Sequence, residues 1–226
     1  MVAALYIFIA GLFYFILYLW KGNPFIDKKI QAVNISTAQF RREILLTIIT
    51  LIIYCITGYC LGLLYQKGRT LIYFNISYYG IIYFVISILV MIFLHDSYFY
   101  WTHRLLHRPG WYEKIHSVHH LSSSPNPWTA LAFHPAEAVI HSVVFPLIFL
   151  IIPAHPAAIF IFLFYSIFMN VLGHSGYQFS PYNNRINKWD WWSNSSKQHD
   201  EHHQYGKDNY GLYFTFWDNW MKTNRK

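Results

Sequence analysis

The chain has 226 residues, of which 55% are hydrophobic and only 12% are charged. Soluble domains carry about twice that share of charged residues, so the composition excludes an ordinary soluble domain and favours a membrane protein. The formal net charge of +7 is spread along the chain rather than gathered into one basic patch, and we therefore expect no nucleic-acid partner.

Three uncharged runs come first along the chain, at residues 1–20, 44–66 and 70–94. Each reaches the roughly 20 residues that a helix needs to cross a bilayer. The first run has no basic start and no small-residue cleavage site, so we expect a retained helix rather than a signal peptide. Cys55 and Cys60 both lie in the second run and are expected to be small buried apolar residues.

A fourth apolar region, residues 138–172, is interrupted by Pro153 and Pro156, and proline ends helices. It is therefore predicted to form a helical hairpin that returns the chain to the side from which it came. Five basic residues lie between the first and second runs, and two lie between the second and third. Because strongly basic loops stay in the cytoplasm, we expect the segments before and after the hairpin to meet at the cytoplasmic face.

All 13 histidines lie between residues 95 and 203, and most fall in three motifs: HRLLH (103–107), HSVHH (116–120) and HDEHH (199–203). Residues at i, i+3 and i+4 share one helix face, so each motif directs its imidazoles to one side. As cations the rings would repel one another, and as buried neutral groups they would need partners. A bound metal supplies such a partner through one ring nitrogen of each histidine.

The number of imidazoles exceeds what one ion can hold. A zinc site takes four ligands, so eight or nine histidines predict two metals with four or five imidazoles each. Imidazole suits iron, zinc, copper and nickel alike, and the ligand type does not choose the metal. A carboxylate-rich di-iron bundle needs two Glu-x-x-His motifs, whereas Glu113–His116 is the only copy here. The metalloprotease motif HExxH is absent as well.

The order and spacing of the motifs, with a hydrophobic hairpin before the last one, resemble the membrane fatty acid hydroxylase and sterol desaturase superfamily. The resemblance extends over about residues 93–223 and includes HDSYFYWTHRLLH, NPWTALAFHP and NYGLYFTFWDNW. It implies a di-iron centre that activates O2 and oxidises an unactivated C–H bond of a lipid, with zinc as a substitute metal in purified protein. It places the metal ligands at His103, His107, His116, His119, His120, His174, His199, His202 and His203.

Four further residues are candidates for supporting or catalytic roles. Asp96 and Tyr100 share a helix stripe with the first histidine motif, and Asp96 is expected to orient a ligand histidine from another element. Asn170 precedes His174 by one turn, and the resemblance implies that it helps to hold a metal through water. His134 belongs to a family motif and is the fourth candidate.

The remaining histidines and the tryptophans are expected to be structural. His95 points away from the ligand face of its helix, while His141 lies in an apolar helix and His155 at the hairpin turn. Interfacial belts of membrane proteins are rich in tryptophan, and we expect such a belt at Trp189, Trp191, Trp192, Trp217 and Trp220.

The sequence thus predicts an all-α integral membrane protein with about four to five transmembrane helices, three long ones plus the hairpin. A cytoplasmic, histidine-rich helical cap is expected to hold a dinuclear metal site. We expect one domain, with N-terminal transmembrane helices at residues 1–94 and a histidine-box catalytic region, hairpin included, at 95–226. The bacterial inner membrane is favoured, and the endoplasmic reticulum if the chain is eukaryotic.

The predicted function is hydroxylation or desaturation of a membrane lipid, an acyl chain or a sterol-like molecule, by two iron ions and O2. The sequence has no flavin or nicotinamide motif, so electrons are expected from a separate reductase, cytochrome b5 or a ferredoxin. A zinc-dependent membrane hydrolase, which would use a metal-bound water, is one alternative. A non-catalytic metal-binding membrane protein is the other.

Overall fold

A computed structural model describes residues 1–179 and 192–225. Over these residues the chain is helical and has isolated bridges but no strand. The helices are α1 (Val2–Tyr14), α2 (Thr37–Gln66), α3 (Gly80–Leu106), α4 (Ser117–His120), α5 (Pro135–Ile151), α6 (Pro156–Gly173), α7 (Ser196–Tyr205) and α8 (Phe216–Met221). Short π-helical or 3-10 turns occur at Phe15–Leu19, Ile26–Lys28, Ile76–Tyr78, Tyr112–His116 and Thr129–Leu131. The predicted all-α class is confirmed.

Four helical segments in the described part of the chain are long and apolar enough to cross a membrane: Val2–Leu19, α2, α3 and α6. α5 is a shorter apolar helix of 17 residues. Their outer faces carry exposed apolar side chains such as Ile52, Ile82 and Leu89, which is the pattern expected where lipid replaces water as the neighbour. The prediction of three long helices plus a hairpin is therefore confirmed.

The α5–α6 hairpin contributes to both apolar cores of the bundle. In one core, Tyr6 and Ile9 of α1 pack against Ile167 of α6, together with residues of α2 and α5. In the other core, Met91 of α3 packs between Val144 of α5 and residues of α6. The hairpin is thus held on one side by α1 and α2 and on the other side by α3.

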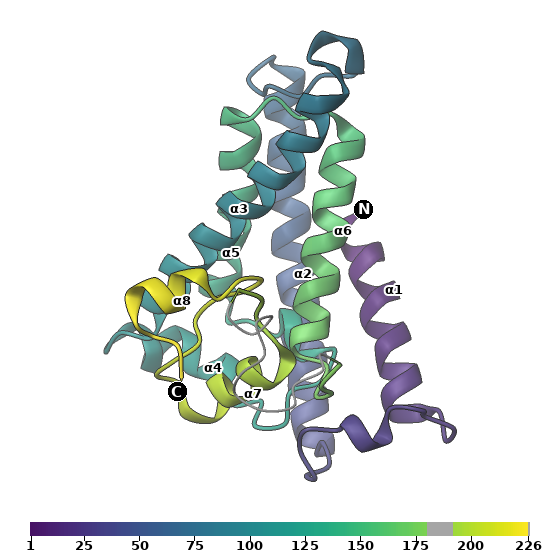
Figure 1. The fold of residues 1–226 in the computed structure, drawn as a ribbon, viewed down its shortest axis with the longest axis vertical. Helices are drawn as coiled ribbons and strands as arrows, with labels where there is room; N and C mark the ends of the chain where they lie inside the picture. The colour runs from purple at the N-terminus through teal and green to yellow at the C-terminus, as the bar shows by residue number, and fades with distance from the viewer. Residues whose placement is uncertain (180–191, 226) are drawn as a thin grey trace.

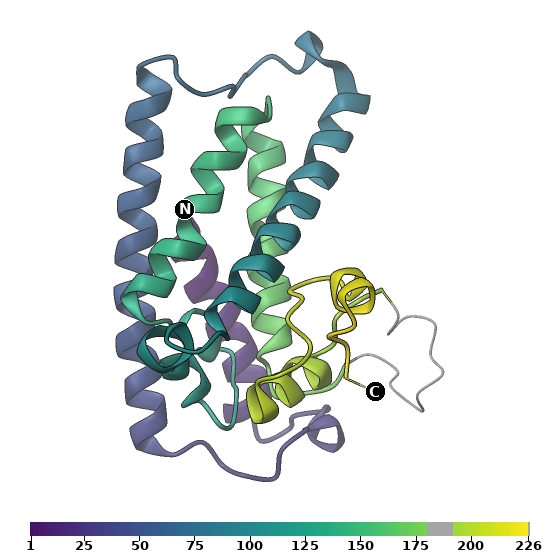
Figure 2. The ribbon, with the colours of Figure 1, turned by 90° about the vertical axis from the view of Figure 1, so that its left-hand side faces the viewer.

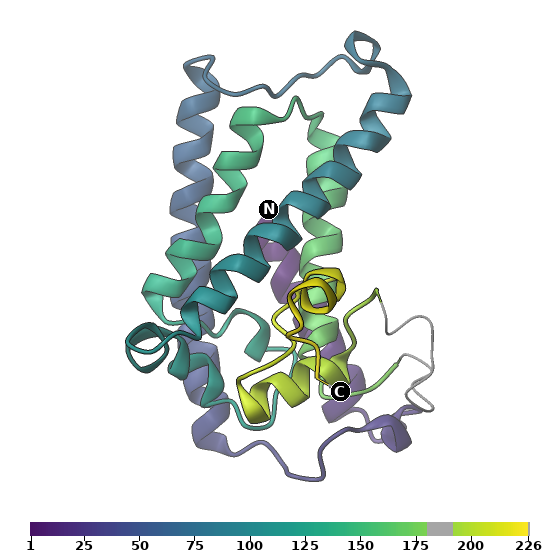
Figure 3. The same ribbon diagram turned by 60° about the vertical axis from the view of Figure 1, so that its left-hand side comes forward.

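The hairpin turn lies at the same end of the bundle as the loop between α2 and α3, as Figure 3 shows. The two connections are joined by backbone hydrogen bonds from Leu71 N to Phe149 O (3.2 Å) and from Tyr73 N to Ala154 O (3.2 Å). At the opposite end, α4 and α7 lie beside the ends of the long helices and form the cap (Figure 1). α1 begins about halfway along the bundle and runs to the cap end (Figure 2).

Two sequence-based expectations are wrong in detail. The uncharged run 70–94 was expected to be helical throughout, but α3 begins only at Gly80, whose φ is +78°. Asn75 caps a 3-10 turn before it by accepting from Ser77 N, and its neighbour Phe74 is 65% exposed. Cys55 and Cys60 are exposed rather than buried.

Candidate metal centre

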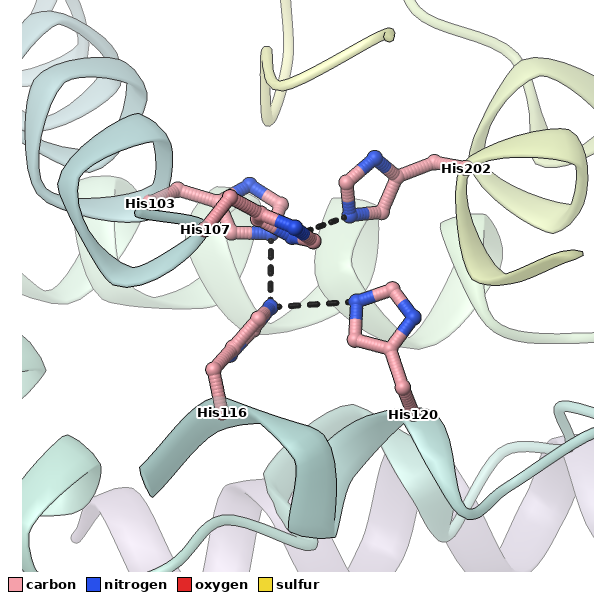
Figure 4. A group of neighbouring side chains, drawn as sticks. All are labelled: His103, His107, His116, His120 and His202. Atoms are coloured by element: carbon pink, nitrogen blue, oxygen red, sulfur yellow. Dashed lines mark hydrogen bonds between the residues drawn. The ribbon is translucent and has the colours of Figure 1, made fainter. Parts of the chain in front are cut away.

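Nine histidines come together at the cap end of the bundle, in two neighbouring groups. Within each group, one ligand nitrogen per ring lies within 4.8 Å of all the others. Cluster one, drawn in Figure 4, consists of His103, His107, His116, His120 and His202. Cluster two consists of His119, His174, His199 and His203. The division into five and four matches the ligand numbers expected for two metals.

Helix geometry explains why the His-x-x-His-His motif occurs twice. In HSVHH the outer pair, His116 and His120, belongs to cluster one, while His119 belongs to cluster two. Each residue turns a helix by about 100°, so positions i and i+4 differ by about 40°, whereas i+3 lies about 60° to the other side. HDEHH repeats the arrangement with the clusters exchanged, since its outer pair joins cluster two and His202 joins cluster one. Each motif therefore links both clusters.

The inward-facing nitrogens lie very close to one another. In cluster one the Nε2 atom of His116 is 3.1 Å from Nε2 of His103 and 3.1 Å from Nε2 of His120 (Figure 4). In cluster two the Nε2 atom of His174 is 3.3 Å from Nε2 of His119 and 2.8 Å from Nε2 of His199. The Nε2 atom of each of these rings therefore faces the centre of its own cluster.

In three of the ligand rings, the outward-facing nitrogen donates a hydrogen bond to a backbone carbonyl. His103 Nδ1 donates to the carbonyl of Tyr210 (2.9 Å), His202 Nδ1 to that of Asp208 (2.6 Å) and His174 Nδ1 to that of Asn170 (2.8 Å). A proton fixed on Nδ1 leaves the lone pair of Nε2 free to face inward. The chain thus selects the tautomer in which each of these rings can bind a metal through Nε2.

His116 is held by a carboxylate rather than by a carbonyl. Its Nδ1 lies 2.7 Å from Oε1 of Glu137, and both side chains are at most 1% exposed. A carboxylate in this position orients a metal-binding imidazole and increases its basicity. Sequence reasoning missed Glu137. The one available signal was a charged residue at the start of an apolar helix, where burial needs a partner.

Burial keeps the ligand rings neutral. Burial, with the imidazoles of His116 and His120 beside it, lowers the pKa of His107 to about 2. Burial lowers the pKa of His116 to about 3 and that of His174 to about 4. Burial and neighbouring imidazoles also hold the pKa values of His119, His199, His202 and His203 well below their usual range. At neutral pH each cluster is a set of converging lone pairs, which repel one another unless a cation lies between them. The residues therefore fit two bound metal ions.

Asp96 and Tyr100 contribute to the centre indirectly. Asp96 was expected to orient a ligand ring directly, but its Oδ1 accepts from the backbone nitrogens of Tyr213 (2.8 Å) and Phe214 (3.3 Å). It thus anchors the C-terminal segment that carries the carbonyl acceptors of His103 and His202. The Tyr100 hydroxyl lies 2.9 Å from Thr223 Oγ1, at the end of the same segment.

Asn170 and His134 are placed differently from the expectation. The Asn170 side chain donates to the carbonyl of Ala130 (2.9 Å), and the contact with the ligand His174 is made by its backbone carbonyl. His134 caps α5, because its Nδ1 accepts from Ala136 N (3.2 Å), and it belongs to neither cluster. His95 also lies outside the clusters, with its Nδ1 2.7 Å from the Tyr213 hydroxyl.

The residues expected to be structural are distributed over the fold. His155 caps α6 at the hairpin turn and donates to Phe74 O (3.1 Å), at the end away from the clusters. His141 packs between the rings of Phe99 and Phe133, which also contact His103 and His119. Glu113 is exposed and accepts from Gly110 N.

Three of the five tryptophans expected in the interfacial belt lie among the described residues. Trp192 and Trp220 are exposed, whereas Trp217 stacks on Tyr100. Trp189 and Trp191 lie outside the described residues.

The bundle and its two histidine clusters define a class of membrane protein with two adjacent candidate metal sites. The chain belongs to the fatty acid hydroxylase family, which it matches over residues 88–223. The family resemblance inferred from the motifs is confirmed. No solved structure matches the chain.

Curated relatives carry sterol-oxidising names. A mouse lathosterol oxidase is 30% identical over 95% of this chain and 68% of its own length. A Delta(7)-sterol 5(6)-desaturase of Gibberella zeae is 34% identical over 70% of this chain and 48% of its own length. A putative methylsterol monooxygenase of Dictyostelium discoideum is 36% identical over 64% of this chain and 52% of its own length. The chain thus spans about half to two thirds of these relatives.

Proposed function

We propose that the protein is an O2-dependent di-iron oxidase that hydroxylates or desaturates an unactivated C–H bond of a membrane lipid. The observation that carries the proposal is the pair of buried imidazole clusters, with Nε2 atoms directed inward, at the end of a membrane bundle. The names of the relatives, sterol desaturases and a methylsterol monooxygenase, support lipid oxidation as the reaction class.

The ligands we assign are the nine histidines of the two clusters. When bound there, two iron ions would activate O2 and supply the oxidising power to remove hydrogen from an alkyl carbon. Backbone carbonyls hold the rings of His103, His174 and His202 in one tautomer, and Glu137 fixes His116. The aromatic ring of Phe133 lies 5.1 Å from that of His119 and keeps the lipid side of the centre apolar, which protects a reactive oxidant from water.

We propose that the electrons come from a separate protein. We propose a reductase, cytochrome b5 or a ferredoxin that approaches cluster one, because His107 and His120 are only half-buried while cluster two is fully buried.

We propose that the cap faces the cytoplasm. Among the described lysines and arginines, only Lys67 and Arg69 belong to the loop at the end opposite the cap, and basic segments remain on the cytoplasmic side. The relatives named above are eukaryotic, which supports the endoplasmic reticulum rather than the bacterial inner membrane.

Oxygen uptake tests the proposal. Purified protein would be loaded with iron or with zinc, given a reductant and membrane lipids, and assayed for O2 consumption and for lipids that gain one oxygen or lose two hydrogens. We expect both signals with iron only, and we expect them to survive His155→Ala. Product formed with zinc in the absence of O2 would instead establish a hydrolase, and lipids left unchanged by the iron form would point to a metal-binding protein without this activity.

A further inference from the structure

Three cavities follow one another from the middle of the bundle to the metal clusters. The bundle cavity, about 440 Å³, lies between α2, α5 and α6 beside the start of α1. The middle cavity, about 40 Å³, shares Val2, Tyr54, Phe145 and Leu163 with it. The cap cavity, about 290 Å³, reaches His174 and His199 and shares Asn170 and Leu212 with the middle cavity. The shared walls make the three spaces consecutive.

The two ends of this path differ in chemistry. The bundle cavity is lined by apolar side chains, and its polar groups Thr57 and Ser142 are hydrogen-bonded to each other (3.0 Å). The cap cavity is lined by polar residues, Ser193, Asn194 and Ser195 among them, as well as by apolar ones such as Leu212. A molecule that fills the path therefore needs a hydrocarbon body and one polar end.

The middle cavity limits the shape of that body. Sites for small molecules usually measure roughly 300–1,000 Å³, a size that the bundle cavity reaches and the cap cavity approaches. The middle cavity, at about 40 Å³, is far smaller. The wall that it shares with the bundle cavity includes Tyr54 and Phe145, whose rings meet edge to face at 6.0 Å. A single alkyl chain is thin along its whole length and can bend, whereas a fused-ring nucleus is broad and rigid.

We propose that the lipid oxidised here is a straight hydrocarbon chain with one polar end group, and that Phe145 and Leu163 exclude fused-ring lipids from the metal centre. The polar end lies in the cap cavity, and the chain passes through the middle cavity into the bundle cavity. This inference rests on the proposed function, and it departs from the sterols named for the relatives.

Photolabelling of the zinc-loaded protein tests the proposal. The probes are diazirine derivatives of palmitic acid, of cholesterol and of hexadecane, and labelled peptides are identified by mass spectrometry. We expect the fatty acid to label the walls of the middle and cap cavities and the sterol to leave these walls unlabelled. Hexadecane should label them about two- to tenfold less than the acid, since it lacks the polar end. Equal labelling by hexadecane would overturn the assignment of the cap cavity.

Widened variants test the constriction. Phe145→Ala and Leu163→Ala should both admit the sterol probe, and either variant suffices if the other fails to fold. Phe160→Ala is the matched control, because this side chain is 45% exposed on the outer face of α6, and it should label as the unmodified protein does. Strong sterol labelling of the middle or cap cavity in the unmodified protein, or none there in the widened variants, would overturn the proposal. Labelling needs neither iron nor O2, so normal labelling without oxygen uptake would defeat the oxidase and leave the cavity assignment intact.

Discussion

Replacement of Glu137 by glutamine should weaken one metal site and spare the other. The carboxylate lies 2.7 Å from Nδ1 of His116, and neither side chain has access to water that could replace it. Loss of such a partner typically lowers metal affinity about 10- to 100-fold, which corresponds to about 1.4–2.7 kcal/mol. Glutamine keeps the size of the side chain and removes the charge.

The effect should be confined to cluster one. His116 is the ring that lies 3.1 Å from both His103 and His120, so a misoriented His116 disturbs the middle of that cluster. Cluster two has its own outer contact, from His174 Nδ1 to the carbonyl of Asn170.

Competition with a chelator measures both sites. Metal-free protein would be titrated with zinc in the presence of a chelating dye, and the metal bound per chain would be counted. In Glu137→Gln one of the two binding steps should weaken, and in Glu113→Gln, an exposed control of identical chemistry, neither should. Two unchanged steps, or equal weakening of both, would refute the role given to Glu137.

Three further predictions concern the same centre. His119→Ala should abolish activity and remove the metal of cluster two, whereas His155→Ala should retain both metals, as elemental analysis can show; equal losses would discredit the ligand assignment. Asp96→Asn should leave the ligands in place but loosen the C-terminal segment, seen as faster hydrogen exchange at Tyr213 N together with weaker metal binding at cluster one; unchanged exchange would contradict the anchor. Metal-free protein should lose stability as the pH falls below the ordinary histidine pKa of 6.5, because the unfolded chain then binds protons that the buried rings do not. The loss is about 1.4 kcal/mol per neutral ring per pH unit, and thermal melts that do not change between about pH 7.5 and 5 would contradict it.

The sequence predicted the helices better than their ends. Uncharged runs are typical of segments that lie in lipid, and these runs therefore predicted the spans of α1, α2 and α6. They also included residues 70–79, where exposed apolar residues such as Phe74 and Tyr78 belong to a loop. An apolar loop and an apolar helix can have the same composition, so only backbone features such as the cap at Asn75 separate them.

The grouping of the histidines could be predicted only in part. Spacing within each motif shows that the rings share a side, but which rings meet depends on how α4 and α7 approach each other in space. Supporting contacts were harder still, since Glu137 lies 21 residues from His116 and Asp96 lies 117 residues from Tyr213. A local pattern carries no information about pairings over such distances.

The acidic residues show how this cap is held together around a metal centre. Of the nine that lie among the described residues, five are buried, and a buried carboxylate is tolerated only when donors surround it. Asp218 illustrates the arrangement, because it accepts from the backbone nitrogens of Tyr210 (2.9 Å) and Gly211 (2.8 Å) and so fixes the segment that holds His103. Burial raises the pKa of Asp218 to about 6. The five are Glu43, Asp96, Glu137, Asp200 and Asp218. Because they are hidden, the exposed surface of the described residues carries few acidic groups, and we propose that the electron donor has an acidic surface.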